Sequence, residues 1–244
     1  MNKLHLARTA AGSDASGFFM CMCGAISRHR PRMRRWMGAA ALALVGAPAV
    51  AAGIVVGAFS GGDLNGWEEK SFKGHTRYAL TMVDGRTVLE AQTDGAASGR
   101  FRKIHIDLTK TPMLEWSWKI EAPYAGIDEN TRRGDDFPVR LYVVIERGVF
   151  GLSSLALNYV WAAQNPVGMR WPNPFTKQAM MLAVDSGAAQ AGQWVKHRRN
   201  VREDLRAAFG EDITAIDAVA VMTDGDNSGS RGHAWYGDIV FSGE

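Results

Sequence analysis

The stretch that decides the fold is residues 223–241, TDGDNSGSRGHAWYGDIVF. An apolar run, 216–222, leads into it, and an aromatic run, 234–241, leads out of it. Between these runs lies a loop of Asp, Asn, Ser and Gly, residues that form tight turns and offer oxygen ligands. We therefore predict two strands joined by an acidic loop, with the final strand closing a β-sandwich.

The sequence before this stretch has the pattern of many short strands. Tyr78, Leu80 and Met82 alternate with other residues, and Asp84-Gly85 separates this run from another β-prone run, which predicts a hairpin. A single convincing helix is predicted at 202–209, where Gly210 ends it. We predict an all-β fold, an antiparallel β-sandwich or jelly roll with one short helix, as a single domain over 53–244.

The N-terminal region, 1–52, differs from the rest of the chain. A cluster of arginines precedes an apolar run at 38–50, and a small-x-small cleavage pattern follows at 49–51. This order is typical of a secretory signal peptide, and Met33 begins a stretch that is already a complete signal. The apolar run is shorter than the roughly 20 residues of a membrane-spanning helix, although a retained signal anchor is the alternative. We predict a periplasmic or secreted protein without a stable membrane span after cleavage.

The composition excludes several classes of site. Cleavage before Gly53 would remove seven of the 28 Lys+Arg and one of the 25 Asp+Glu, which changes the formal net charge from +3 to −3. This mildly acidic chain lacks the basic footprint of a nucleic-acid-binding protein. Both cysteines, Cys21 and Cys23, precede the cleavage pattern, so the mature chain has no disulfide, thiolate metal ligand or cysteine nucleophile.

Five ordered motifs in the mature chain resemble a known family. They are GDDFPVRLYV at 134–143, NYVW at 158–161, Trp194 with RNV at 199–201, MTD at 222–224 with DN at 226–227, and WYGDI at 235–239. They are similar to the domain-of-unknown-function 3047 family of exported bacterial proteins. This resemblance implies export and a β-sandwich, and it brings no activity and no catalytic residues. A weaker similarity is to galactose-binding-like jelly rolls, which include many carbohydrate-binding modules.

The acidic loop fits the first half of a calcium loop. Asp224, Asp226 and Ser228 place oxygen ligands at alternate positions, and Gly229 occupies the sixth. The twelfth position is a tryptophan rather than the bidentate glutamate of an EF-hand, so a calcium site would need another ligand, either Asp238 or a backbone carbonyl. The sequence therefore allows a Ca²⁺ site, and a turn capped by Asp and Asn side chains is the alternative.

The candidate ligand-binding residues are Asp136, Arg140, Trp161, Trp171 and Arg199. Asp136 and Arg140 share a face if the strand already runs at Asp136, either as a half-buried ion pair or as ligand-binding groups. Trp171, in a loop rich in Pro and Asn, is the best candidate for an exposed ring, and Trp161 is the second. Sugars stack their C–H faces on such rings, whereas buried rings would belong to the core.

Three functions are compatible with these residues. The first is an exported, non-catalytic β-sandwich that binds a polysaccharide or cell-envelope glycan. The second is a glycan-active hydrolase on the same fold, with Asp136 and either Asp224 or Asp226 as its two carboxyl groups. The third is a structural or partner-binding envelope protein. We expect a binding protein rather than an enzyme.

Overall fold

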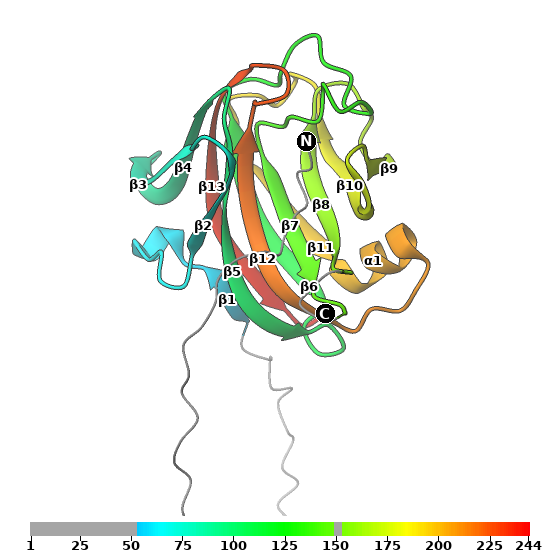
Figure 1. Cartoon of the computed structure of the whole chain (residues 1–244). Helices are drawn as coiled ribbons and strands as arrows, with labels where there is room; N and C mark the ends of the chain where they lie inside the picture. The colour runs from blue at the N-terminus through cyan, green and yellow to red at the C-terminus, as the bar shows by residue number, and fades with distance from the viewer. Residues whose placement is uncertain (1–52, 149–152) are drawn as a thin grey trace, which may run out of the picture. The chain divides into compact units, whose positions relative to one another are not determined.

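The computed structural model describes residues 53–148 and 153–244, so the predicted signal peptide lies outside the described residues. These residues form two packed sheets, A and B (Figure 1). Sheet A contains, in spatial order, β11 (Val195–Asn200), β6 (Met113–Ile120), β13 (Arg231–Ser242), β4 (Arg86–Asp94) and β3 (Arg77–Val83), and β1 (Ile54–Gly57) also pairs with β13. Sheet B contains β2 (Glu68–Lys73), β5 (Ala97–Asp107), β12 (Ala215–Asp224), β7 (Arg140–Ile145), β8 (Leu155–Ala162), β10 (Thr176–Ser186) and β9 (Arg170–Asn173). The prediction of a β-sandwich is confirmed.

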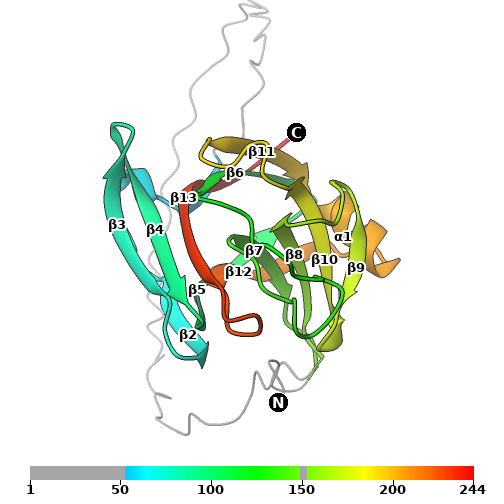
Figure 2. The ribbon, with the colours of Figure 1, turned by 90° about the horizontal axis from the view of Figure 1, so that it is seen from above.

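The core lies between the inner faces of the two sheets. Trp116 and Trp118 of β6 are buried there together with Tyr159 of β8 in sheet B. The rings of Trp116 and Tyr159 are 5.2 Å apart, so aromatic contact joins the two sheets directly. Figure 2 shows the two layers from above, with β6 and β11 in one and β7, β8 and β10 in the other.

The stretch that decides the fold passes from one sheet to the other. β12 lies between β5 and β7 in sheet B, and β13 lies between β4 and β6 in sheet A. The loop between them turns sharply at Gly225, where a Cβ atom would lie 2.2 Å from the carbonyl oxygen of Ser230. Glycine is therefore required at this position, and the predicted pair of strands joined by an acidic loop is confirmed.

Local turn chemistry fixes the other elements that the sequence predicts. Asp84 and Gly85 have φ angles of 51° and 78°, which suit the two-residue turn between β3 and β4. Helix α1 (Val201–Phe209) begins at Asn200, whose side chain accepts a hydrogen bond from the Glu203 amide, and ends at Gly210 in the left-handed region. No helix in the described part of the chain is long and apolar enough to cross a membrane.

Two features differ from the sequence prediction. β8 and β10 pair in parallel, so the sandwich is not wholly antiparallel. Residues 170–173, expected as irregular loop, form the edge strand β9, which pairs with β10. The connection between β8 and β10 is long enough to return the chain to the same end of the sheet, and β9 is built within that return.

Candidate ligand groove on sheet B

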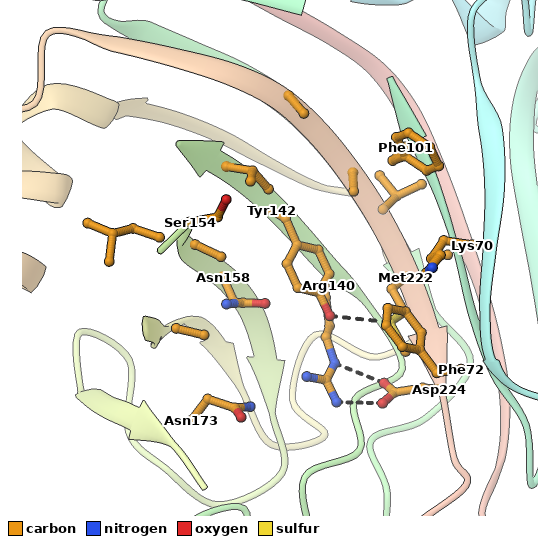
Figure 3. A pocket seen from close by; sticks show the side chains of 18 of the residues that line it. Lys70, Phe72, Phe101, Arg140, Tyr142, Ser154, Asn158, Asn173, Met222 and Asp224 are labelled. Atoms are coloured by element: carbon orange, nitrogen blue, oxygen red, sulfur yellow. Dashed lines mark hydrogen bonds and ion pairs between the residues drawn. The ribbon is translucent and has the colours of Figure 1, made fainter. Parts of the chain in front are cut away.

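The outer face of sheet B carries a groove with a cavity volume of about 360 Å³. Strand alternation produces it, because Val219 and Val221 of β12 point into the core while Ala218 and Ala220 point outward. Small outward residues on β5, β12, β8 and β10 leave the floor of this face hollow on both sides of β7, and they are Gly99, Ala218, Ala220, Ala156 and Ala179. Figure 3 shows Lys70, Phe72 and Phe101 on one side of the groove and Ser154, Asn158 and Asn173 on the other.

A single row of side chains crosses the middle of the groove. Ala220 pairs with Phe101 on one side and with Tyr142 on the other, and Tyr142 pairs in turn with Asn158. The two aromatic residues are therefore two strand spacings apart, about 10 Å. The small side chain of Ala220 leaves space between the two rings, so a flat ligand could lie there in contact with both.

Asn158 supplies a polar group beside Tyr142. Its Nδ2 donates a hydrogen bond to the carbonyl oxygen of Met180 at 3.2 Å, which fixes the orientation of the amide. Its Oδ1 is buried and has no hydrogen-bond partner within the described residues. A buried acceptor without a partner lowers the stability of the fold by about 1–3 kcal/mol. This asparagine is therefore better explained by a role in binding than by a role in stability.

An ion-paired cluster closes one end of the groove. Arg140, the first residue of β7, donates from Nε and Nη2 to the two carboxylate oxygens of Asp224 at 2.9 and 2.5 Å. Its Nη2 also donates to the backbone oxygen of Asp135 at 2.6 Å, and Asn173 donates to the Asp135 carboxylate at 3.0 Å. Burial by itself would lower the pKa of Arg140, but the carboxylates of Asp135 and Asp224 outweigh it and raise the pKa well above its usual value. The guanidinium is therefore a permanent charge, neutralised within the protein.

Asp136 does not pair with Arg140 as predicted. The strand begins only at Arg140, and Asp136 lies in the preceding loop, where its carboxylate turns toward the loop between β12 and β13. It accepts hydrogen bonds from the backbone amides of Asn227 and Ser228 at 3.0 and 2.6 Å and from the Ser228 hydroxyl at 2.6 Å. Asp136 therefore anchors the acidic loop and does not line the groove.

The predicted metal ligands gather only in part. Carboxylate oxygens of Asp136, Asp224 and Asp226 lie within 4.8 Å of one another, close enough to hold a metal ion. Ser228 is bound to Asp136, and Asp238 lies on β13 of sheet A, where it accepts hydrogen bonds from the amide and hydroxyl of Ser60.

These residues fit a hydrogen-bonded anchor better than a Ca²⁺ site. Both oxygens of Asp224 already accept from Arg140, and those of Asp136 accept from N–H and O–H groups. Calcium takes six to eight oxygen ligands and would have to displace these donors.

The two tryptophans predicted to be exposed are both buried, so that prediction is wrong. Trp161 is 0% exposed in the main core and donates from Nε1 to the Gly187 carbonyl at 2.9 Å. Trp171 is 4% exposed, because β9 places it on the outer face of sheet B in a small second core with Phe137 and Met181. This second core covers the sheet next to the groove and leaves the rest of the outer face open.

Arg199, another predicted ligand-binding residue, forms an ion pair within the protein. It lies at the end of β11, and its Nε donates to Asp204 of α1 at 2.8 Å. Asp204 also accepts from the hydroxyl of Tyr159 at 3.0 Å, so the three residues fasten the helix to both sheets. Arg199 does not line the groove.

Phe101, Tyr142, Asn158 and Ala220 are not among the site residues predicted from the sequence. A signal was present in the alternation of alanine with valine in β12, AVAV at 218–221. Alanine at outward positions of a strand indicates either a covered face or a hollow one. Whether such a face is covered or hollow depends on the side chains of the neighbouring strands. The order of those strands follows from long-range pairing, which the sequence pattern does not give.

The chain resembles several solved structures at low identity. One is TmCBM61 in complex with β-1,4-galactotriose (10% identity, TM-score 0.38, covering 77% of this chain and 94% of that one). Another is the family 30 carbohydrate-binding module of a cellulosomal cellulase of Clostridium thermocellum (12%, 0.41, 73% and 92%). A third is TmCBM27, described for specific mannan recognition (10%, 0.36, 80% and 99%). At these identities and TM-scores the similarities do not indicate a ligand for this chain.

Sequence comparison gives a more definite result. None of the curated proteins matches this sequence. A family model described as "Protein of unknown function (DUF3047)" matches residues 65–240, which include every strand of the groove. The match spans well over half of the chain and agrees with the five motifs, so the chain belongs to the DUF3047 family.

Proposed function

We propose that this protein is an exported, non-catalytic glycan-binding β-sandwich whose ligand lies in the groove of sheet B. The observation that carries the proposal is the row formed by Phe101, Ala220 and Tyr142, in which a hollow separates two aromatic rings. Export rests on the signal pattern at 1–52, and a polysaccharide or cell-envelope glycan is the corresponding partner.

The chemistry of the groove suits a sugar. Apolar floors and aromatic rings favour the C–H faces of a pyranose, and a few placed polar groups select its hydroxyls. Asn158 and Asn173 lie along one wall and Lys70 along the other, around a floor of alanines. A linear chain could run along this open face, since the groove is bounded by ion-paired residues at one end only.

The geometry favours binding over hydrolysis. A glycosidase needs two carboxyl groups about 5–10 Å apart, one of them able to donate a proton. Asp135 and Asp224 line the groove, but both are hydrogen-bonded to the same guanidinium of Arg140. A carboxylate held by arginine keeps its charge and is a poor general acid. The remaining acid of the lining, Glu146, directly follows β7 at the opposite end of the groove.

Affinity electrophoresis tests the proposal. The purified protein is run through gels that contain a panel of polysaccharides, next to the variants Tyr142→Ala and Ala220→Leu. Retardation by at least one polymer, lost in both variants, is the expected result. Retardation that survives both substitutions would place binding outside the groove, and no retardation in any gel would favour the partner-binding alternative. Release of reducing ends from a retained polymer would instead support a hydrolase.

A further inference from the structure

Two lysines beside the groove are exposed and make no ion pair within the described residues. Lys70 of β2 and Lys103 of β5 are exposed and line the groove, and neither has an ion-pair or hydrogen-bond partner within the described residues. Many other cations of the chain are paired, such as Arg100 with Glu69 and Arg147 with Glu211. Glu68 is also exposed and pairs with Phe101 on this face, so the three side chains give this wall a net charge of +1, on a chain whose net charge from Gly53 onward is −3.

The register places the two lysines on either side of an aromatic ring. Lys70 pairs with Gly99 of β5, and Lys103 lies four residues further along that strand, about 13 Å away. Phe101 stands midway between them on the same face. A ligand that covers Phe101 would consequently bring groups within reach of both ammonium groups, one on each side.

Glu68 offsets one of the two positive charges without forming an ion pair with either lysine, and the acids that line the groove offset neither. Asp135 and Asp224 are bound to Arg140, and Lys103 pairs with Ala218 across the ladder rather than with an acid. Glu146 directly follows β7, two strands away from β5, at the end opposite the ion-paired cluster. Both lysines are thus left to interact with a ligand, and exposed charges of this kind select partners of opposite sign.

We propose that the ligand of this groove is an acidic polysaccharide, with its acid groups bound by Lys70 and Lys103 and an intervening sugar unit on Phe101. The proposal rests on the glycan-binding function proposed above and adds the class of glycan. The acid groups could be carboxylates or sulfates, because an ammonium group binds either as a point charge. The neighbouring hollow at Ala220 would then hold the uncharged part of the chain.

The test compares charged and uncharged forms of the same polymers. Wild-type protein is run in gels containing pectate or fully methyl-esterified pectin, and dextran sulfate or dextran. The variants are Lys70→Gln/Lys103→Gln and, as a control with the same loss of charge, Lys110→Gln/Lys196→Gln. Lys110 follows β5 and Lys196 lies on sheet A, so neither lines the groove. Ala220→Leu is included to fill the groove without changing its charge.

We expect retention by at least one acidic polymer, no retention by its neutral form, and about tenfold weaker binding in the groove double variant at low salt. The control variant should bind like wild type, and Ala220→Leu should not bind. Equal retention by neutral polymers with no effect of the groove lysines would overturn the acidic ligand and leave the glycan-binding function intact. Retention by acidic polymers that survives Ala220→Leu would also overturn it, since binding would then be a general surface effect. Retention by no polymer would overturn both proposals.

Discussion

Both carboxylate oxygens of Asp224 accept hydrogen bonds from the guanidinium of Arg140, at 2.9 and 2.5 Å, with the two side chains only 0% and 4% exposed. The pair joins β12 to β7, and Asp224 also accepts from the backbone amide of Phe137 at 3.1 Å. The charged side chains at this end of the groove are therefore neutralised by ion pairs within the protein. This arrangement provides rigidity at the point where the loops of the two sheets meet.

Replacing Arg140 by methionine should destabilise the protein by about 3–5 kcal/mol, because Asp224 would remain as a buried charge without its partner. Urea denaturation measures the free energy of unfolding. The double variant Arg140→Met/Asp224→Asn should recover part of the loss, since it removes the charges of Arg140 and Asp224 and leaves only Asp135 buried without the guanidinium. A loss below about 1 kcal/mol in the single variant would contradict the buried pairing.

Filling the hollow at Ala220 with leucine should abolish ligand binding and leave stability within about 0.5 kcal/mol of wild type, because the side chain faces an open groove. Thermal unfolding and affinity electrophoresis on the same preparation separate the two effects. Ala189→Leu, at an exposed position in the turn after β10, makes the same substitution away from the groove. If this control also lost binding, the assignment of the groove would fail.

Alanine at Trp171 should cost about 3–5 kcal/mol of stability, as expected for a large ring removed from a packed site. The effect on ligand affinity, measured on the folded fraction below the transition, should be small. This outcome differs from that of an exposed sugar-binding ring, whose loss would weaken binding and spare stability. The free energy of unfolding and the ligand affinity, measured together, therefore distinguish a core tryptophan from a ligand-binding tryptophan.

Stability near α1 should depend on pH in the acid range. The hydrogen bond from Arg202 lowers the pKa of Asp212 to about 2, against about 3.9 in an unfolded chain. The folded-state pKa is depressed, so the stabilisation is fully present above about pH 4 and is lost as the pH falls through 2. The difference in Tm between wild type and Asp212→Asn should be constant above pH 5 and shrink between pH 4 and pH 2. A difference that stays constant down to pH 2 would show that Arg202 does not bind Asp212 in solution.

Calcium should not stabilise the protein measurably. The carboxylates of Asp136 and Asp224 already accept hydrogen bonds, and a cation would have to displace these donors. Thermal unfolding with millimolar CaCl₂ and with EDTA should give the same Tm. An increase that depends on calcium concentration would instead support the metal site predicted from the loop sequence, since a ligand of the native state raises Tm by mass action.

Local rules predict the parts of this fold that depend on neighbouring residues. The turn at Asp84-Gly85 and the ends of α1 follow from backbone preferences that need no tertiary information. The buried face of β6 follows from alternation, because Trp116 and Trp118 recur with period two among other apolar residues. These predictions agree with the structure because each depends only on residues that are close together in the sequence.

The site could not be predicted to the same extent, because it depends on which strands are neighbours. Phe101 and Tyr142 are 41 positions apart in the chain, and a third strand, β12, brings them to the same row from the far end of the sequence. The edge strand β9 was read as a loop, so Trp171 was expected in solvent rather than in a core. Long-range pairing decided both outcomes, and periodicity within one segment carries no information about it.

The position of β13 at the centre of sheet A has a consequence for how the chain is made. β4 and β6 each pair with β13, yet about 110 residues separate the end of β6 from the start of β13. At a synthesis rate of roughly 5–20 residues per second, both strands wait several seconds for their shared neighbour. During that interval β3 can pair with β4 and β11 with β6, but the two halves of sheet A have no strand to join them. If the protein is exported, as the N-terminal pattern predicts, sheet A is therefore completed only by residues that are among the last to be synthesised.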